Sequence, residues 1–339
     1  MIKTIKNFQF ENKKVLVRCD FNIPLTDDFR IKQTLPTINY LIKKRAIIIL
    51  ISHFGRPDGR ELKFSLRSVA RRLEKILKKK IVFVDDCIGK KVEKEIKKLK
   101  PGQIILLENL RFYKEEEAND LNFAKELSKL ADIYINDAFS ASHRAHASIV
   151  GVTTFLPSVI GLLFEKEIKT LTDLMKNSKK PLVVIIGGQK VETKTKVIDK
   201  LSKIADYLLI GGLMQKEIKE KKIKLKYPKK IIGPINETSK KDIDLKTMNL
   251  FKEKIMLAKT IFWNGPLGQV EKKEFSKGTE EIIKAIIKSR AFSIVGGGET
   301  VEFINQLGLI KKFNHVSTGG GALLEFLAGE KLPGIEALT

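Results

Sequence analysis

Residues 182–188 read LVVIIGG, an uninterrupted apolar run that ends in two glycines. Such a short, mostly β-branched run is typical of a strand that is buried on both faces of a parallel sheet. Glycines directly after the strand allow the main chain to approach a ligand closely. The stretch therefore predicts a parallel α/β sheet whose functional edge lies where its strands end.

The same pattern recurs along the whole chain. Strand-length apolar runs alternate with amphipathic segments, such as 66–77, for which Ser65 is the expected N-cap. Alternating strands and helices predict the α/β class. The predicted strands cover residues 15–19, 46–51, 81–84, 104–107, 133–135, 182–186, 207–210, 261–263 and 292–295.

The length of 339 residues indicates about two domains, at roughly 150 residues each. The strand series pauses at Pro157, and a long helical pattern follows from about Ser158 to Met175. We expect two Rossmann-like domains, each a mostly parallel sheet flanked by helices, joined by a hinge helix. Residues 1–157 would form the first domain, with the tail at about 328–339 folding back onto it, and residues 158–327 the second.

The formal net charge of +24 raises the possibility of a nucleic-acid or membrane-surface partner. The excess is mostly lysine, interleaved with glutamate and with isoleucine or leucine, as in residues 216–230. This interleaving favours a solvated surface over a nucleic-acid interface. A positive field would also speed the encounter with polyanionic substrates.

The amino-terminal stretch MIKTIKNFQFENKK lacks the apolar core of a secretory signal, and no apolar run approaches the ~20 residues of a membrane span. Cys19 and Cys87 are far apart and have no metal-binding spacing, so we expect reduced thiols. These features predict a cytoplasmic protein without a membrane partner.

Polar residues follow the strands of the first half. Asp20 and Asn22 follow residues 15–19, His53 and Arg56 follow 46–51, and Arg111 follows 104–107. A single arginine of this kind is more often a solvated surface charge. The planar guanidinium binds phosphate or carboxylate oxygens in pairs, so several on separate loops indicate a small, multiply anionic ligand. The arginines concerned are Arg30, Arg56, Arg111 and Arg144.

Glycines follow the strands of the second half, at 187–188, 211–212 and 296–298, and again at 319–321 near the carboxyl terminus. Any one of them could be a tight packing turn, but their repetition favours main-chain amides that bind phosphate at helix N-termini. Lys190 and Lys194, predicted on one helical face, would add two cations. The chain has neither a G-x-x-x-x-G-K-[ST] loop nor a G-x-G-x-x-G after its first strand, which weakens P-loop and dinucleotide-dependent dehydrogenase alternatives.

An arginine cluster in one half and a glycine array in the other, joined by a hinge helix, predict phosphoryl transfer by domain closure. Eight stretches resemble the phosphoglycerate kinase family in order and spacing, from about residue 4 to the carboxyl terminus. They are VRCDFNIP (17–24), SHFGRP (52–57), LLENLRF (106–112), NDAFSASHRAHAS (136–148), GGQKVETKTK (187–196), WNGPLG (263–268), VGGGET (295–300) and STGGGALLEFLAGEKLPG (317–334).

The resemblance implies a monomeric enzyme that transfers a phosphoryl group between 1,3-bisphosphoglycerate and ADP, giving 3-phosphoglycerate and ATP, with Mg²⁺. It implies that 3-phosphoglycerate is held by Asp20, Asn22, Arg30, His53, Arg56, Arg111 and Arg144. The nucleotide would be held by Gly188, Lys190, Lys194, Gly212, Asn264, Glu271, Gly296, Gly297, Gly298, Glu299 and Thr300, supported by the main chain of 319–321. Arg30 and Lys190 would act on the moving group, and Glu299 would bind the metal.

The sequence departs from the family pattern mainly in the second half. The segment between Gly212 and Asp244 is shorter than in the family, which implies a simplified wall of the nucleotide site. The family's Gly-Pro-Lys-Thr is Asp-Leu-Lys-Thr at 244–247, its Gly-Gly-Ala-Lys has Gln189 as the third residue, and its Met-Gly-Val-Phe-Glu is Leu-Gly-Gln-Val-Glu at 267–271. Glu299 replaces the family's metal-binding aspartate, one methylene longer. A relative that keeps its ligand sites but has weakened catalysis is the alternative.

Overall fold

The computed structural model describes residues 2–22, 27–235 and 241–339. The fold divides into two compact units, Met1–Ile168 with Lys331–Thr339, and Lys169–Glu330. Ile23 and Pro24, the last residues of the predicted 17–24 motif, lie outside the described residues. Within the described ranges, no helix combines the length and apolar character that a membrane span requires.

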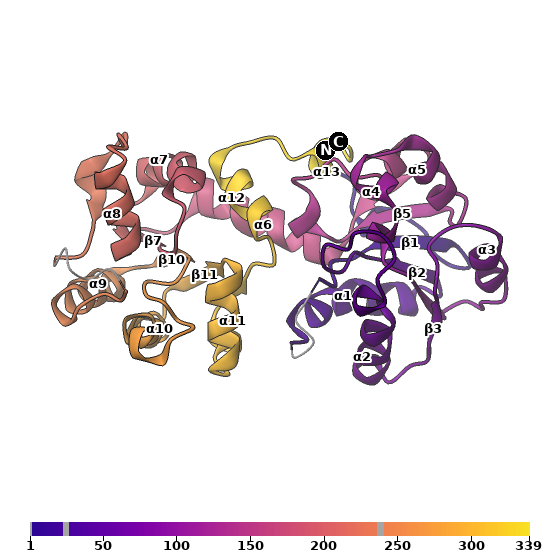
Figure 1. The fold of residues 1–339 in the computed structure, drawn as a ribbon, viewed down its shortest axis with the longest axis horizontal. Helices are drawn as coiled ribbons and strands as arrows, with labels where there is room; N and C mark the ends of the chain where they lie inside the picture. Colours follow the sequence, from indigo (N-terminus) through magenta and orange to yellow (C-terminus); the bar gives the residue numbers. More distant parts are fainter. Residues whose placement is uncertain (1, 23–26, 236–240) are drawn as a thin grey trace. The chain divides into compact units, whose positions relative to one another are not determined.

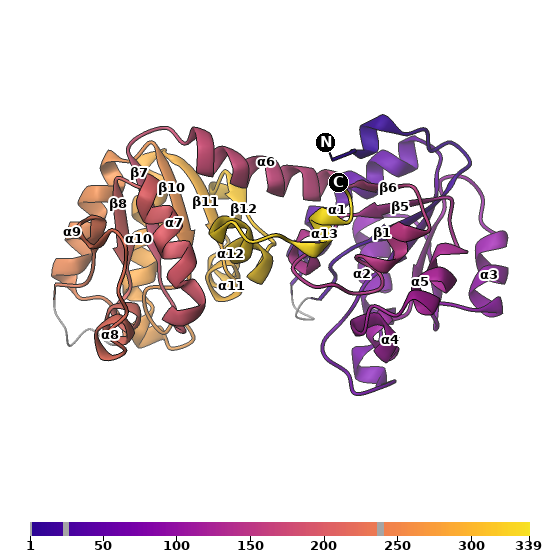
Figure 2. The same ribbon diagram turned by 90° about the horizontal axis from the view of Figure 1, so that it is seen from above.

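The first unit contains a six-stranded sheet in which every pairing is parallel (Figures 1 and 2). Its strands are β1 (Lys14–Arg18), β2 (Ile47–Ile51), β3 (Ile81–Val84), β4 (Ile104–Leu107), β5 (Ile133–Asn136) and β6 (Ser158–Ile160). Its helices are α1 (Phe29–Lys43), α2 (Arg67–Leu77), α3 (Lys90–Lys97), α4 (Lys114–Glu117), α5 (Leu121–Ser128), the first part of α6 (Leu162–Asn177), and α13 (Pro333–Glu336).

Alternation along the strands sends neighbouring side chains into two separate cores. Val15 and Val17 of β1 pack with residues of α1 and α2 on one face of the sheet. Leu16 packs with residues of α3 and α5 on the other face. Because both faces are covered by helices, the strands are continuously apolar, which is the pattern that the sequence shows.

The second unit contains a second six-stranded, all-parallel sheet. Its strands are β7 (Leu182–Ile186), β8 (Tyr207–Ile210), β9 (Ile231–Ile232), β10 (Thr260–Asn264), β11 (Phe292–Gly296) and β12 (His315–Val316). Its helices are α7 (Thr195–Ile204), α8 (Gly212–Glu220), α9 (Leu245–Leu257), α10 (Lys277–Ser289), α11 (Gly298–Gln306) and α12 (Gly321–Ala328). Helix α9 packs on α10, and α7 packs on α12 (Figure 1).

Both sheets contain a point at which the strand order reverses. The orders are β3-β4-β2-β1-β5-β6 and β12-β11-β10-β7-β8-β9, so the reversal lies between β1 and β5 in the first unit and between β7 and β10 in the second. The second order is that of dinucleotide-binding folds. Ligands of open parallel sheets bind outside the carboxyl ends of the strands at such a point. The predicted fold class is confirmed, and each sheet has one expected location for a site.

Two predicted helix starts are wrong. Residues 158–160 form β6 beside β5, and α6 begins only at Leu162. Helix α2 begins at Arg67, and its N-cap position is Leu66 rather than Ser65. The Ser65 hydroxyl accepts a hydrogen bond from Arg67 N (3.2 Å) and donates to Glu108 (2.7 Å), so it anchors the turn that precedes the helix.

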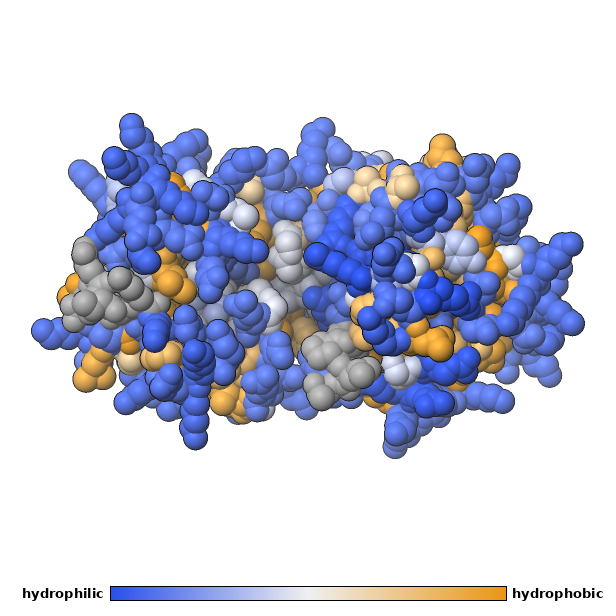
Figure 3. Space-filling view, viewed as in Figure 1, coloured by the Kyte–Doolittle hydropathy of each residue, from blue (hydrophilic) through white to orange (hydrophobic). Residues whose placement is uncertain are grey.

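Hydrophilic side chains cover most of the face of the molecule seen in Figure 3, and the apolar spots between them are small and separate. This agrees with a lysine-rich surface that is solvated. Cys19 and Cys87 are buried free thiols, as predicted, and burial raises the pKa of both.

Candidate functional site

The candidate site of the first unit lies at the carboxyl ends of β1, β2, β4 and β5. Asp20 and Asn22 follow β1, and His53 and Arg56 follow β2. Arg111 lies in the 3-10 turn Leu110–Phe112 after β4. The loop after β5 carries Ser140, His143 and Arg144. Arg30 lies in the first turn of α1 rather than on a loop, which corrects the prediction that all four arginines are loop residues.

Asp20 organises the part of this site next to β1. Its Oδ2 accepts hydrogen bonds from Arg30 Nη1 and from the Ser140 hydroxyl, and its Oδ1 accepts one from Asn22 N at 3.0 Å. Burial by itself raises the pKa of Asp20, but Arg30, His53 and the two neighbouring donors outweigh burial and hold that pKa well below its usual range. Asp20 is therefore a carboxylate that fixes the Arg30 guanidinium.

Asn22 and Arg111 both bind the main chain of Gly55. Asn22 Oδ1 accepts from Gly55 N (2.9 Å), and Arg111 Nη1 donates to Gly55 O (2.7 Å). The turn at Gly55 adopts φ +65, and a Cβ there would lie 2.4 Å from the Phe64 ring, so only glycine fits. The loops after β1, β2 and β4 are joined at this residue.

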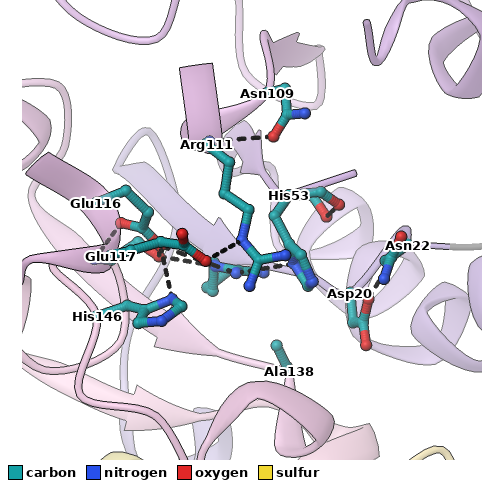
Figure 4. A network of polar contacts seen from close by, with 12 residues as sticks. Asp20, Asn22, His53, Asn109, Arg111, Glu116, Glu117, Ala138 and His146 are labelled. Atoms are coloured by element: carbon teal, nitrogen blue, oxygen red, sulfur yellow. Dashed lines mark hydrogen bonds and ion pairs between the residues drawn. The ribbon is translucent and has the colours of Figure 1, made fainter. Parts of the chain in front are cut away.

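Asn109 and Glu117 hold Arg111 in place (Figure 4). The buried Asn109 side chain accepts from Arg111 N (3.1 Å) and donates to Phe54 O (2.7 Å). Glu117 Oε1 lies 2.9 Å from Arg111 Nε. The pKa of Arg111 is lowered, mainly by burial.

The cluster is strongly positive, as two histidines beside it show. Burial lowers the pKa of His146 to about 3, with further lowering by Arg18, Arg111 and Arg144. Burial also lowers the pKa of His143, and Arg144 adds to this effect. Arg144 Nε lies 3.2 Å from His143 Nε2. Neutral histidines next to several guanidinium groups are the arrangement expected where an anion is to be bound.

The structure brings most, but not all, of the predicted residues of this unit into contact with one another. Asp20, Arg30, His53, Arg111 and Arg144 act on one another or on shared neighbours. Arg56 is exposed, and among the described residues no ion pair involves its side chain. Sequence reasoning missed three residues of this site. Ser140, on the loop after β5, binds Asp20, and Arg18, at the end of β1, contacts His53. Glu116, on α4, lies next to Arg18. A charge inside the apolar run 15–19 was the one signal that could have pointed to Arg18.

The candidate site of the second unit lies where β7 and β10 end side by side. Gly187 N donates to Asn264 O (2.9 Å), and Gly188 N donates to Pro266 O (2.7 Å). Gly265 has φ +87, and the buried Trp263 donates from Nε1 to its carbonyl at 2.8 Å. The two glycine turns are thus joined by their main chains at the reversal point of the sheet.

A cavity of about 230 Å³ opens beside these turns. Its lining includes the predicted residues Gly188, Gly212, Glu271 and Glu299. It also includes Gly211, the other member of the predicted glycine pair 211–212. The remaining lining residues were not selected from the sequence as ligand residues, namely Gln189, Leu213, Pro266, Leu267, Gly268 and Gln269. The lining thus combines glycine main chain, the side chains of two leucines and two carboxylates.

Lys190 and Lys194 do not lie on one helical face, and that prediction is wrong. Lys190 has a left-handed conformation (φ +62) and precedes the 3-10 turn Val191–Lys194, because the chain must turn sharply before α7 begins at Thr195. Lys190 is exposed. Lys194 Nζ donates to Gly187 O (2.6 Å), and burial lowers the pKa of Lys194.

Two polar atoms near the remaining glycines have no hydrogen-bond partner within the described residues: Asn264 Nδ2 and Thr300 Oγ1, both buried. A Cβ on Gly297 would lie 3.2 Å from Asn264 Nδ2, so this amide faces the turn between β11 and α11. Gly319 and Gly320 lie between β12 and α12, and Gly321 is the first residue of α12. Orphaned donors beside glycine turns at helix N-termini suit a phosphate.

A metal at this site would depend on Glu299. No group of three or more His, Cys, Asp or Glu side chains that could hold a metal is found in the described part of the chain. Mg²⁺ is commonly bound by one or two carboxylates together with substrate phosphates. The exposed Glu299, which lines the cavity, fits that mode of binding but could not hold the ion alone.

The segment Asp-Leu-Lys-Thr at 244–247, which differs from the family pattern, forms the start of helix α9. Asp244 accepts from Thr247 N (2.8 Å) as the N-cap of α9, and buried Thr247 accepts from Ile235 N (3.0 Å). The aspartate that replaces the family's glycine therefore has a local structural role.

Comparison with known proteins finds phosphoglycerate kinases that match this chain over nearly its whole length. A family model described as phosphoglycerate kinase matches residues 5–225 and 217–330. The phosphoglycerate kinase of Dictyoglomus turgidum is 45% identical, over 99% of this chain and 98% of its own length. That of Borrelia garinii subsp. bavariensis is 43% identical, over 99% of both chains. The solved phosphoglycerate kinase of Pyrococcus horikoshii OT3 superimposes with a TM-score of 0.88 at 33% identity, covering 100% of this chain and 98% of that one.

The comparison also shows where this chain is shorter. The alignment to the Dictyoglomus protein spans 388 positions, whereas this chain has 339 residues, so the relative contains segments that are missing here. The family model matches in two ranges that overlap at residues 217–225. This overlap lies inside the segment between Gly212 and Asp244 that the sequence predicts to be shortened.

Proposed function

The chain belongs to the phosphoglycerate kinase family, and from this membership we propose that it catalyses the reversible transfer of a phosphoryl group from 1,3-bisphosphoglycerate to ADP. A β-phosphate oxygen of ADP attacks the acyl phosphorus, the bond from phosphorus to the acyl oxygen breaks, and 3-phosphoglycerate leaves with the electron pair as a carboxylate. No alcohol is deprotonated, so the reaction needs positioning and charge stabilisation more than a general base.

The observation that carries the proposal is the positive cluster of the first unit. Arg30, Arg111 and Arg144 are each fixed by a neighbouring carboxylate, carbonyl or imidazole, and they surround neutral histidines. Such a cluster suits 3-phosphoglycerate, which has one carboxylate and one phosphate. Asp20, Asn22, His53 and Arg56 complete the proposed set, and Arg30 is the residue that we assign to the moving group.

The second unit would bind the nucleotide. Gly188, Gly212, Glu271 and Glu299 line its cavity, and Lys194 is held at the turn beside it. Lys190 would neutralise the transferring oxygens, while Asn264, Thr300 and the turns at 296–298 and 319–321 would bind phosphate. Mg²⁺ would be held by Glu299 together with nucleotide phosphates, and it would neutralise phosphate charge.

The remaining features of the proposal follow from the family and the chemistry. The two substrates must meet for transfer, so we assign hinge bending to the chain segments that join the units. Closure would exclude water, which otherwise hydrolyses the acyl phosphate. We further propose a cytoplasmic monomer whose partners are these small molecules and not nucleic acid.

Phosphorylation of 3-phosphoglycerate by the purified protein, measured with ATP and Mg²⁺, tests the proposal. Turnover that disappears when Mg²⁺ is chelated supports it. No turnover by protein whose circular dichroism shows an intact fold would instead favour a relative that only binds the ligands.

A further inference from the structure

Arg18 is a fully buried arginine at the end of β1, and its side chain contacts His53 of the candidate site. Its Nη2 lies 3.1 Å from His53 Nδ1, its Nε donates to Ser148 Oγ at 2.8 Å, and its Nη1 donates to Cys19 O. Because the guanidinium is inaccessible, it cannot touch a ligand itself. The hydrogen-bonding contact through which it reaches the predicted ligand residues is the one with His53.

The contact between Arg18 and His53 fixes which imidazole nitrogen carries the proton. A guanidinium group has five N–H donors and no acceptor. His53 Nδ1 must therefore accept, and the single proton of the neutral ring must sit on Nε2. If both ring nitrogens carried a proton, the Nδ1–H of His53 would face the Nη2–H of Arg18, and no hydrogen bond could form.

The charges around His53 keep the ring neutral. Burial lowers the pKa of His53 well below its ordinary value, and Arg18, Arg111 and Arg30 lower it further, against the opposing effect of Asp20. His53 is thus surrounded by three guanidinium groups and one carboxylate.

The Arg18 charge is itself balanced. Glu116 Oε1 lies 4.0 Å from Arg18 Nη2, and this fully buried carboxylate accepts from Ser148 N (2.9 Å) and Ser148 Oγ (2.6 Å). Moving the guanidinium away from Glu116 would leave two unpaired buried charges, which is costly. The pair therefore holds the guanidinium in one position. Figure 4 shows Glu116 and His146 on one side of Arg111, and His53 and Asp20 on the other.

We infer that Arg18 is a positioning residue for the reaction, which locks His53 as a neutral imidazole whose Nε2–H is available to the anionic ligand. The inference rests on the proposed function in one respect, the identity of that ligand as 3-phosphoglycerate. His53 then contributes a directional hydrogen bond and no charge, and its contribution does not change across the physiological pH range.

Nitrogen-15 NMR of histidine-labelled protein tests the tautomer without any need for turnover. The chain has only 4 histidines, and His53→Gln assigns the signal of interest. From about pH 5.5 to about pH 8, the parent protein should show His53 as the neutral Nε2–H form throughout. An Nδ1–H tautomer, or titration of His53 within that range, would overturn the inference.

A charge-neutral double variant, Arg18→Met with Glu116→Gln, then removes the lock, and Glu116→Gln alone is its matched control. In the double variant we expect a mixture of the two neutral tautomers, because burial, Arg111 and Arg30 still lower the pKa of His53. The dissociation constant of 3-phosphoglycerate should rise at ~pH 8 and at ~pH 5.5 alike, by about twofold if the two tautomers are equally populated and by more if the Nδ1–H form dominates. The control loses stability because the Arg18 charge is left unpaired, but it keeps the contacts of Arg18 with His53, Ser148 and Cys19 and should therefore keep the Nε2–H form.

The outcomes separate this inference from the proposed function. A double variant that keeps both the tautomer and the 3-phosphoglycerate affinity refutes the role of Arg18. Absence of kinase turnover in the parent, with the tautomer and the binding as expected, refutes the proposed function and leaves the role of Arg18 in place. Should the double variant not fold, the measurement on the parent protein still decides the tautomer.

Discussion

Gly187 and Gly265 pack main chain against main chain at the reversal point of the second sheet. A Cβ on Gly265 would lie 2.3 Å from Gly187 O, and one on Gly187 would lie 2.0 Å from Pro266 O. Both contacts are with backbone atoms, which cannot move aside as a flexible side chain can. The turns after β7 and β10 can therefore coexist only if both residues are glycine.

Gly187→Ala should destabilise the second unit by about 3 kcal/mol, because an added methyl group must displace main chain. Trp263 is the single tryptophan of the chain and is buried beside Gly265, so its fluorescence during urea unfolding reports on this unit. Gly298→Ala is the matched control: a Cβ there would meet nothing within 4 Å, and we expect a change below about 0.5 kcal/mol. Equal stability of the two variants would contradict this packing.

Arg30→Ala should lower kcat by about a hundredfold, because it removes a cation assigned to the transferring phosphoryl group. Arg45→Ala is the control, since Arg45 is an exposed arginine just beyond the same helix α1 and, among the residues that the structure describes, its ion pair is with exposed Glu11 at 3.7 Å. It should leave kcat unchanged. Steady-state kinetics with 3-phosphoglycerate and ATP separate the cases, and an effect of Arg30→Ala confined to KM would show that Arg30 binds the ground state instead.

Lys190→Ala should also lower kcat by about a hundredfold, since the side chain is exposed beside the glycine turn and nothing described holds it away from a nucleotide. Lys200→Ala, a neutralised exposed lysine on α7, controls for the loss of general positive field. Both variants are compared by kcat at saturating nucleotide. If the two lower the rate equally, the effect belongs to the field of the protein and not to Lys190.

Much of the fold could be predicted from the sequence because strands buried on both faces leave an unbroken apolar signal. All nine predicted strands exist, with ends within one residue of those predicted. The missed strands β6, β9 and β12 have three, two and two residues, too few to show a pattern. Strand-end residues such as Asp20 and Gly187 could be selected because parallel strands bring their carboxyl ends to one edge.

What the sequence could not predict depends on contacts between distant segments. Ser140 binds Asp20 across 120 positions, and Arg18 binds Ser148 across 130, without any periodic pattern linking them. Lys190 and Lys194 have helical spacing, yet a positive φ at Lys190 breaks the helix. The roles assigned to the site residues stay predictions, and the variants described here test them.

Glu299→Gln should weaken the apparent affinity for Mg²⁺ about tenfold, because the amide keeps an oxygen ligand but loses the charge. Glu302→Gln, a neutralised exposed glutamate on the same helix α11, is the control and should leave the Mg²⁺ dependence unchanged. Rates measured over a range of Mg²⁺ at fixed ATP give both values. Unchanged Mg²⁺ dependence in Glu299→Gln would mean that nucleotide phosphates alone hold the ion.

Asp137 is a buried acidic residue that binds the first turn of α6. It is fully buried, its Oδ1 accepts from Leu163 N (3.0 Å) and Phe164 N (3.2 Å), and its Oδ2 has no partner within the described residues. Burial raises the pKa of Asp137 to about 7, although the hydrogen bonds from Thr37 and from the two amides oppose it. The folded protein therefore binds this proton more tightly than the unfolded chain does.

The stability contribution of Asp137 should accordingly fall as the pH rises from about 4, the ordinary pKa of an aspartate, to about 7. Asp137→Asn keeps the acceptor for both amides and cannot ionise, so it should remove that slope. We expect the variant to gain about 1–2 kcal/mol relative to the parent at ~pH 8 and to gain less at ~pH 5. Urea unfolding followed by circular dichroism measures both, with exposed Asp58→Asn as the control. A variant that loses stability relative to the parent as the pH rises would reverse the sign and show that Asp137 is stabilised as the carboxylate.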